Sequence, residues 1–191
     1  VVIGVFSAIA AILMVLEFPV PFAPSFYGLD FSELPALIGA FAYGPVAGVM
    51  IEFCKILIKL VLKPSSTAFV GELANFSISC MLVLPASVIY LFKKSRKQAI
   101  LGTVVGTLIM TAFGSCFNAI YLLPKFSELY GIPLDAIIGM GTAINPAIHS
   151  ISGLVLMCVV PLNLLKGGLV SLITILVYKK LSPILKAAHK Q

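Results

Sequence analysis

The side chains best suited to chemistry form a short polar island, Pro161-Leu-Asn-Leu-Leu-Lys-Gly-Gly168, between two strongly apolar stretches. Amide and ammonium groups are costly in hydrocarbon unless partners or water meet them. On a helix Asn163 and Lys166 would share a face, and together they offer hydrogen-bond donors and an acceptor. The pair suits a ligand rich in carbonyl and hydroxyl groups, which Gly167 and Gly168 would let approach closely. Alternatively, Lys166 extends to the membrane interface and Asn163 caps a helix.

Two further sets of polar residues recur at helical spacing. Asn118 and Tyr121 lie near the end of one apolar segment, and Asn75 and Ser79 lie in another, with Glu72 about one turn earlier. They could extend a binding site. Membrane helices also use Asn and Ser to bind one another, so helix packing is the alternative.

A charged stripe recurs at three- and four-residue steps, formed by Glu52, Lys55, Lys59 and Lys63. The spacing predicts an ion pair between Glu52 and Lys55. A proton relay usually needs several titratable groups within reach of one another. We expect the stripe to face a partner protein or a polar interior rather than a ligand.

Small residues recur near the start of the chain. Gly4 and Ala8, and Ser7 and Ala11, form two overlapping pairs four residues apart, a spacing that allows close approach of membrane helices. The pairs predict either a contact inside the protein or a docking face for a second membrane protein.

Catalytic and metal-binding motifs are missing. The sequence has no HExxH, GxSxG, Walker lysine loop or DDxxD motif. Nothing joins a nucleophile to a base, so we expect no catalytic site, no metal site and no ATPase activity. A membrane-embedded enzyme is therefore disfavoured.

The composition predicts an integral membrane protein. Of 191 residues, 60% are hydrophobic and 10% are charged, against roughly 25% charged in soluble domains. Lys and Arg exceed Asp and Glu by 13 to 7. These basic residues cluster at the ends of apolar segments, so they indicate membrane topology rather than nucleic-acid binding.

The elements that must position these residues are helices. Apolar segments predict a single all-α domain over 1–191 with six transmembrane helices, at 1–18, 32–43, 45–62, 68–92, 98–123 and 162–181. We interpret the first as a membrane helix rather than a signal peptide, because it lacks a basic leader. Residues 134–160 predict a long loop containing partial helices.

The positive charges predict the orientation. A basic turn follows the fourth segment, and further lysines follow the sixth: Lys93, Lys94, Arg96, Lys97, Lys179, Lys180, Lys186 and Lys190. The positive-inside rule places both groups, and both termini, in the cytoplasm. The loops 19–29, 63–67 and 125–160 then face outward. The first carries Phe26 and Tyr27, which could cover a ligand.

The whole pattern resembles a known family. Six short segments in 191 residues, the small-residue first helix, Asp30-Phe-Ser-Glu-Leu-Pro35 entering the second segment and Gly44-Pro45 after it are similar to the S components of energy-coupling factor (ECF) transporters. The segment 161–167 resembles that of the riboflavin-binding member of this family.

The resemblance implies a substrate-binding transport subunit in the cell membrane. Members bind a vitamin on the outer side and deliver it inward, together with a membrane coupling protein and two cytoplasmic ATPase subunits. It implies riboflavin as the transported ligand, with no other cofactor. Asn163, Lys166, Asn118, Tyr121, Tyr27, Phe26 and Asn75 become the expected ligand-binding residues, and Gly4, Ser7, Ala8 and Ala11 the expected docking residues. Thiamin or a related heterocycle, or a non-transport membrane scaffold, are the alternatives.

Overall fold

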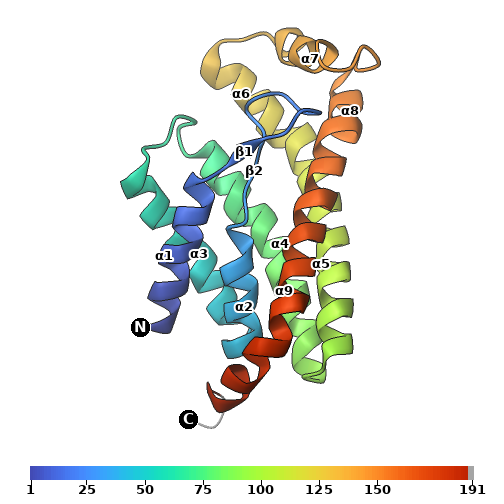
Figure 1. Cartoon of the computed structure of the whole chain (residues 1–191). Helices are drawn as coiled ribbons and strands as arrows, with labels where there is room; N and C mark the ends of the chain where they lie inside the picture. Colours follow the sequence, from blue (N-terminus) through green and yellow to red (C-terminus); the bar gives the residue numbers. More distant parts are fainter. Residues whose placement is uncertain (189–191) are drawn as a thin grey trace.

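In the computed structural model, the apolar segments form helices that run side by side (Figure 1). The structure describes the backbone of residues 1–188 and the side chains of residues 1–177. The lysines that follow residue 177 therefore lie outside the described side chains. The main helices are α1 (Val2–Val15), α2 (Glu33–Tyr43), α3 (Pro45–Leu62), α4 (Val70–Phe92), α5 (Arg96–Phe117) and α9 (Val160–Ala188).

Turn residues separate these helices where the sequence predicts. Gly44 has φ of +95°, a conformation that glycine adopts readily, and Pro45 then occupies the first turn of α3. Ser95 caps α5, because its hydroxyl accepts a hydrogen bond from the Gln98 backbone N–H at 3.3 Å.

Two helices are longer than the sequence predicts, because each continues through a π-helical segment. α5 continues through η1 (Asn118–Leu122) into α6 (Leu123–Tyr130). α8 (Ile151–Leu154) continues through η2 (Val155–Val159) into α9. A proline follows each π segment, and the residue four positions before that proline lies within the segment. In an α-helix the carbonyl of this residue would have no donor, because proline lacks a backbone N–H.

The prediction that the last apolar helix begins at residue 162 is therefore wrong. The helix begins at Ile151 and passes Pro161 without a break, so Asn163 and Lys166 lie well inside it. Within 134–160 the structure has one separate helix, α7 (Leu134–Thr142), before that long helix begins.

Three helices of the described part are long and apolar enough to cross a membrane. They span Val70–Phe92, Arg96–Tyr130 and Ile151–Val177. α1 and α2 are shorter, with 14 and 11 residues. α3 has 18 residues and carries Glu52, Lys55 and Lys59. The protein is thus an all-helical membrane bundle with very little strand.

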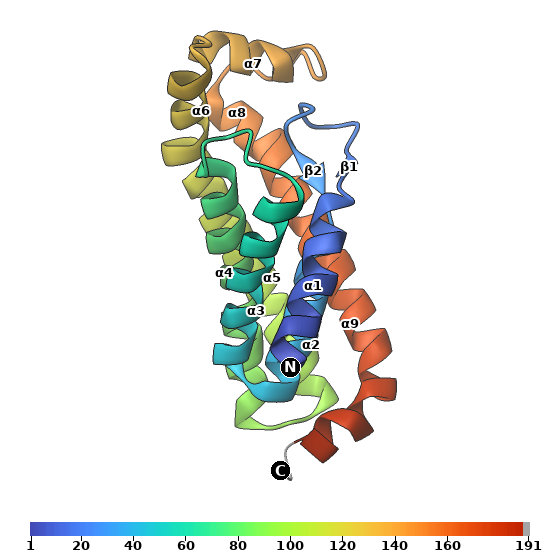
Figure 2. The ribbon, with the colours of Figure 1, turned by 90° about the vertical axis from the view of Figure 1, so that its left-hand side faces the viewer.

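Loops gather at one end of the bundle. The short strands β1 (Phe18–Pro19) and β2 (Gly28–Leu29) pair antiparallel at the base of the first loop. α7 lies across the same end (Figure 2), while α1 begins at the opposite end (Figure 1).

α4 and α5 pack closely because α5 carries glycines at their contact. A Cβ at Gly102 would lie 2.5 Å from the Ala86 carbonyl oxygen, and one at Gly106 would lie 2.5 Å from that of Leu82. These glycines let the two backbones touch, as is common between membrane helices.

The small residues of α1 divide between two faces. Ser7 and Ala11 are fully buried by the chain's own helices, and the Ser7 hydroxyl donates to the Ile3 carbonyl at 2.7 Å. Gly4 is exposed and Ala8 is partly exposed. The four residues therefore do not form one accessible docking face: Ser7 and Ala11 belong to internal packing, and only Gly4 and Ala8 remain on the surface.

Candidate functional site

A cavity of about 660 Å³ lies at the loop end of the bundle, between helices and the first loop. Six of the seven predicted binding residues line it: Phe26, Tyr27, Asn75, Asn118, Asn163 and Lys166. Its size lies within the ~300–1,000 Å³ typical of small-molecule sites. Tyr121 does not line it. That side chain is 38% exposed and packs against Phe117, with ring centroids 5.1 Å apart.

The first loop is held over the cavity by a buried hydrogen bond. The Tyr27 hydroxyl donates to Asn118 Oδ1 at 2.8 Å, and Asn118 Nδ2 donates to the Gly114 carbonyl at 2.7 Å. Burial, and then the nearby Cys158, raise the pKa of Tyr27, so its hydroxyl stays neutral and remains a donor. Phe26 packs on Tyr27 and against Phe126, with ring centroids 4.7 and 6.2 Å apart. Tyr27 and Phe26 therefore cover the cavity as one aromatic unit.

Two asparagines on the cavity wall carry polar atoms without a partner in the described part of the chain. These atoms are Asn163 Nδ2 on α9 and Asn75 Oδ1 on α4. Asn163 is 7% exposed. Gly114 makes room for it, because a Cβ there would lie 2.8 Å from Asn163 Nδ2. Buried polar atoms are normally satisfied, so an unpaired donor and an unpaired acceptor on one cavity wall indicate a ligand.

Lys166 is already engaged by two carboxylates. Its Nζ donates to Asp30 Oδ2 at 2.9 Å and lies 2.8 Å from Glu33 Oε1, and its side chain is 11% exposed. Burial opposes ionisation of Asp30, but Lys166 and Lys55 hold the pKa of this carboxyl below its ordinary value. An ammonium group has three donors, and two of those of Lys166 point to these acids.

Sequence reasoning missed Asp30 and Glu33 as site residues, although both line the cavity. The sequence placed both acids only at the entrance to the second apolar segment and gave them no role, yet Asp30 is 5% exposed. A signal was present: a lysine inside an apolar helix needs a carboxylate partner, and these two acids stand three residues apart at the start of α2.

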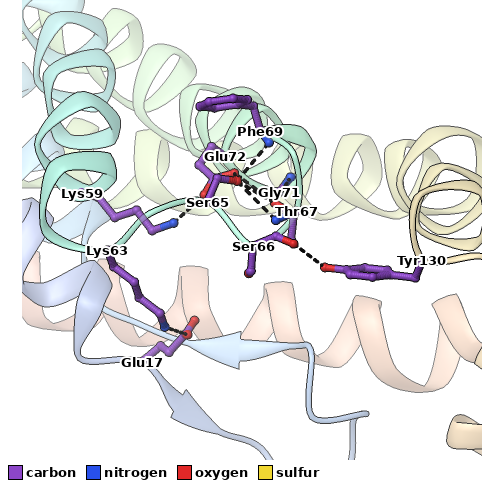
Figure 3. A network of polar contacts seen from close by, with 10 residues as sticks. All are labelled: Glu17, Lys59, Lys63, Ser65, Ser66, Thr67, Phe69, Gly71, Glu72 and Tyr130. Carbon is purple, nitrogen blue, oxygen red and sulfur yellow. Dashed lines mark hydrogen bonds and ion pairs between the residues drawn. The ribbon is translucent and has the colours of Figure 1, made fainter.

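Figure 3 shows a second polar cluster, most of whose residues line the cavity. We call it the mouth cluster, because the side chains of its members Lys63 and Glu17 are about half exposed. Glu72 is its centre: it pairs with Lys59 and accepts hydrogen bonds from the Ser65 and Thr67 hydroxyls at 2.8 and 3.0 Å. Two further contacts tie this region to neighbouring elements. The Tyr130 hydroxyl donates to the Ser66 carbonyl at 3.0 Å, and Lys63 lies 3.4 Å from Glu17 (Figure 3).

The charged stripe of α3 is thus divided along its length. Glu52 and Lys55 form the predicted ion pair and are fully buried inside the bundle. Lys59 and Lys63 belong to the mouth cluster instead. In the described part of the chain no three His, Cys, Asp or Glu side chains gather as a metal site would require.

Comparisons with known proteins agree with this arrangement. Residues 1–178 match the family described as "ECF transporter, substrate-specific component". The riboflavin transporter RibU of Staphylococcus aureus (strain TCH60) is 34% identical over 184 residues, which are 96% of this chain and 90% of that protein. The riboflavin transporter FmnP of Bacillus subtilis (strain 168) is 32% identical over 186 residues, covering 96% and 91% of the two chains.

A solved structure, described as the S component of a bacterial ECF transporter, is also similar. It superposes with a TM-score of 0.73 at 36% identity, covering 97% of this chain and 95% of the other. The resemblance seen in the sequence is therefore confirmed, and the protein is a transport subunit rather than an enzyme. The chain belongs to the substrate-specific (S) components of ECF transporters.

Proposed function

We propose that this protein is the riboflavin-binding S component of an ECF importer. One observation carries the proposal: relatives that match nearly the whole chain are riboflavin transporters. The cavity, with its unpaired polar atoms, provides a place for such a ligand. The ligand is captured on the outer side of the cell membrane and delivered inward with the help of partner subunits.

The cavity suits the chemistry of riboflavin. This vitamin has a flat tricyclic ring, a polar edge that carries both carbonyl acceptors and an N–H donor, and a hydroxylated side chain. Asn163 Nδ2 is an unpaired donor and Asn75 Oδ1 an unpaired acceptor, so together they match such an edge. Lys166 supplies its third N–H, and the aromatic pair Phe26 and Tyr27 covers the ring. Asn118 contributes by holding Tyr27 in place.

The orientation of the helices in the membrane follows from the positions of the basic residues. We assign six membrane helices, formed by α1, α2, α3, α4, the long helix Arg96–Tyr130 and the long helix that starts at Ile151. The basic turn at 93–97 then lies in the cytoplasm together with both termini. The cavity, the first loop and α7 face outward.

Transport requires partners that supply the energy. We infer a membrane coupling protein that docks on α1 at Gly4 and Ala8, the small residues that remain on its surface, and two cytoplasmic ATPase subunits that act with it. Ala8→Trp should leave riboflavin affinity unchanged and abolish assembly and uptake, because the indole blocks close helix approach. Ile9→Trp is the matched control: Ile9 is 45% exposed on the same helix, and this variant should assemble normally. Equal assembly of the two variants would count against this face.

Titration of the purified protein tests the ligand. Protein purified from riboflavin-containing medium should be yellow, and riboflavin fluorescence should be quenched on binding to ligand-free protein. Thiamin in excess should not compete. Competition by thiamin, or no signal with riboflavin by fluorescence or calorimetry, would overturn the assignment.

A further inference from the structure

The cavity wall contains few side chains that give up an electron easily. Tryptophan, the most easily oxidised aromatic residue, is absent from the sequence, and tyrosine comes next. Of the tyrosines whose side chains the structure describes, only Tyr27 and Tyr130 line the cavity. Phe26 and Phe126 also line it, but a phenyl ring is much harder to oxidise than a phenol. An electron that leaves this wall for an aromatic ligand therefore comes most easily from a tyrosine.

The two tyrosines hold different positions around the cavity. Tyr27 belongs to the first loop, is 8% exposed and packs its ring on Phe26, while its hydroxyl donates to Asn118 Oδ1 at 2.8 Å. Tyr130 is 48% exposed at the end of α6, and its hydroxyl donates to the Ser66 carbonyl in the mouth cluster (Figure 3). A ligand in the cavity thus lies under a buried phenol that is fixed at both its ring and its hydroxyl.

The proposed ligand becomes an oxidant when it absorbs light. The tricyclic ring of riboflavin absorbs blue light, and flavins accept single electrons. The excited ring is a far stronger oxidant than the ground state. Left alone, it fluoresces, loses its hydroxylated side chain, or passes its energy to oxygen and forms singlet oxygen. A phenol packed against the ring competes with all of these processes, because electron transfer over such a short distance is fast.

We propose that Tyr27 is an electron donor that quenches the light-excited state of bound riboflavin and so protects the captured vitamin and its site. The inference rests on the proposed riboflavin site. One electron passes from the neutral Tyr27 phenol to the excited ring, and the same electron then returns to Tyr27. No covalent bond forms or breaks, and the phenol proton stays in the hydrogen bond to Asn118 Oδ1. The cycle converts light into heat and consumes no other oxidant or reductant.

The cavity contains side chains that unquenched riboflavin would damage. Met14, Met110 and Met140 line it, and oxidation turns a methionine thioether into a polar sulfoxide. Such a change would disturb the apolar part of the wall. Met140 is 42% exposed on α7, so dissolved oxygen reaches it easily. This residue is therefore a natural reporter of photochemical damage at the site.

Time-resolved flavin fluorescence of the purified full chain at saturating riboflavin tests the electron donor. Bound riboflavin should have a much shorter lifetime than free riboflavin, and the lifetime should lengthen severalfold in Tyr27→Phe, which keeps the ring and loses the phenol. Tyr130→Phe, on the same cavity, and Tyr121→Phe, away from it, should stay as quenched as the wild type. A short lifetime in Tyr27→Phe, or an equal recovery in Tyr130→Phe, would overturn the proposal.

A second variant separates electron donation from the position of the first loop. Asn118→Leu breaks the same hydrogen bond as Tyr27→Phe but keeps the phenol. Riboflavin bound to Asn118→Leu should therefore remain quenched. An equal recovery of the lifetime in both variants would show that the loop position controls the emission, and it would refute the role of Tyr27 as electron donor.

Blue-light illumination in air gives a readout that does not depend on emission. Sulfoxide at Met140, measured by mass spectrometry, should accumulate faster in riboflavin-loaded Tyr27→Phe than in the loaded wild type. Equal rates would refute the protective role. Calorimetry measures binding independently of light. No heat with riboflavin would mean that the proposed function fails, whereas normal binding with equal lifetimes in the wild type and Tyr27→Phe would sink this inference alone.

Discussion

Replacing Asn163 by Leu tests whether this side chain serves to bind the ligand or to stabilise the fold. Asn163 Nδ2 is buried and unpaired in the described chain, and leucine has nearly the same shape without the polar atoms. An unpaired buried polar group costs about 1–3 kcal/mol, so its removal should leave the ligand-free protein equally stable or more stable by up to that amount. With ligand present, the lost donor leaves a ligand acceptor buried and unpaired, which should weaken riboflavin binding roughly 5- to 150-fold.

The matched control is Asn118→Leu, in a side chain of the same type on the same cavity. Both polar atoms of the Asn118 amide have partners, so this substitution breaks its bonds to Tyr27 and Gly114 and should destabilise the ligand-free protein by about 1–3 kcal/mol. Thermal unfolding in detergent measures stability, and fluorescence quenching measures affinity. The unfolding temperature should stay the same or rise in Asn163→Leu and should fall in Asn118→Leu. A lowered unfolding temperature for Asn163→Leu together with unchanged riboflavin affinity would refute the reasoning.

Three further outcomes follow from the packing and charges. Gly114→Ala should weaken riboflavin binding with little loss of stability, because the new methyl group displaces the Asn163 amide. A fluorescence titration with riboflavin measures this loss of affinity. Gly106→Ala should instead lower the unfolding temperature, by about 1–3 kcal/mol of stability, because its methyl group meets the Leu82 carbonyl oxygen; unchanged stability would contradict the close α4–α5 contact. The pKa of Asp30 is lower in the folded protein than in the unfolded chain, so its ionised carboxylate stabilises the fold at neutral pH. The unfolding temperature should therefore fall as the pH drops below about 4, and it should fall less in Asp30→Asn.

Much of the helical framework could be predicted because apolar length and helix breakers are local properties. α3 has the predicted bounds, since Gly44 and Pro45 fix its start and Pro64 follows its end. The start of the last helix could not be predicted in the same way. Pro161 is typical of a helix start, and the preceding π segment that accommodates it has no simple sequence signature.

The site was predictable in part, because polar residues stand out within apolar segments. Polar residues in apolar segments had to be functional or paired. Four of those singled out do lie around one cavity, together with two aromatic residues of the first loop: Asn75, Asn118, Asn163, Lys166, Phe26 and Tyr27. Which of them are paired depends on contacts between distant segments. Tyr27 and Asn118 are 91 positions apart, and Lys166 and Asp30 are 136 apart. Tyr121 shows the limit of helical spacing, because the π segment η1 changes the direction of side chains just where the spacing was applied.

The two π segments also have a consequence for tolerance to insertion and deletion. Each residue of an α-helix turns the next by about 100°, so removing one residue from η1 would rotate all of α6 about its axis by that angle. Phe126 and Tyr130 would then leave the cavity wall even though no contact residue had been replaced. A deletion of one residue, which an ordinary loop absorbs, would here change which face of the helix lines the cavity.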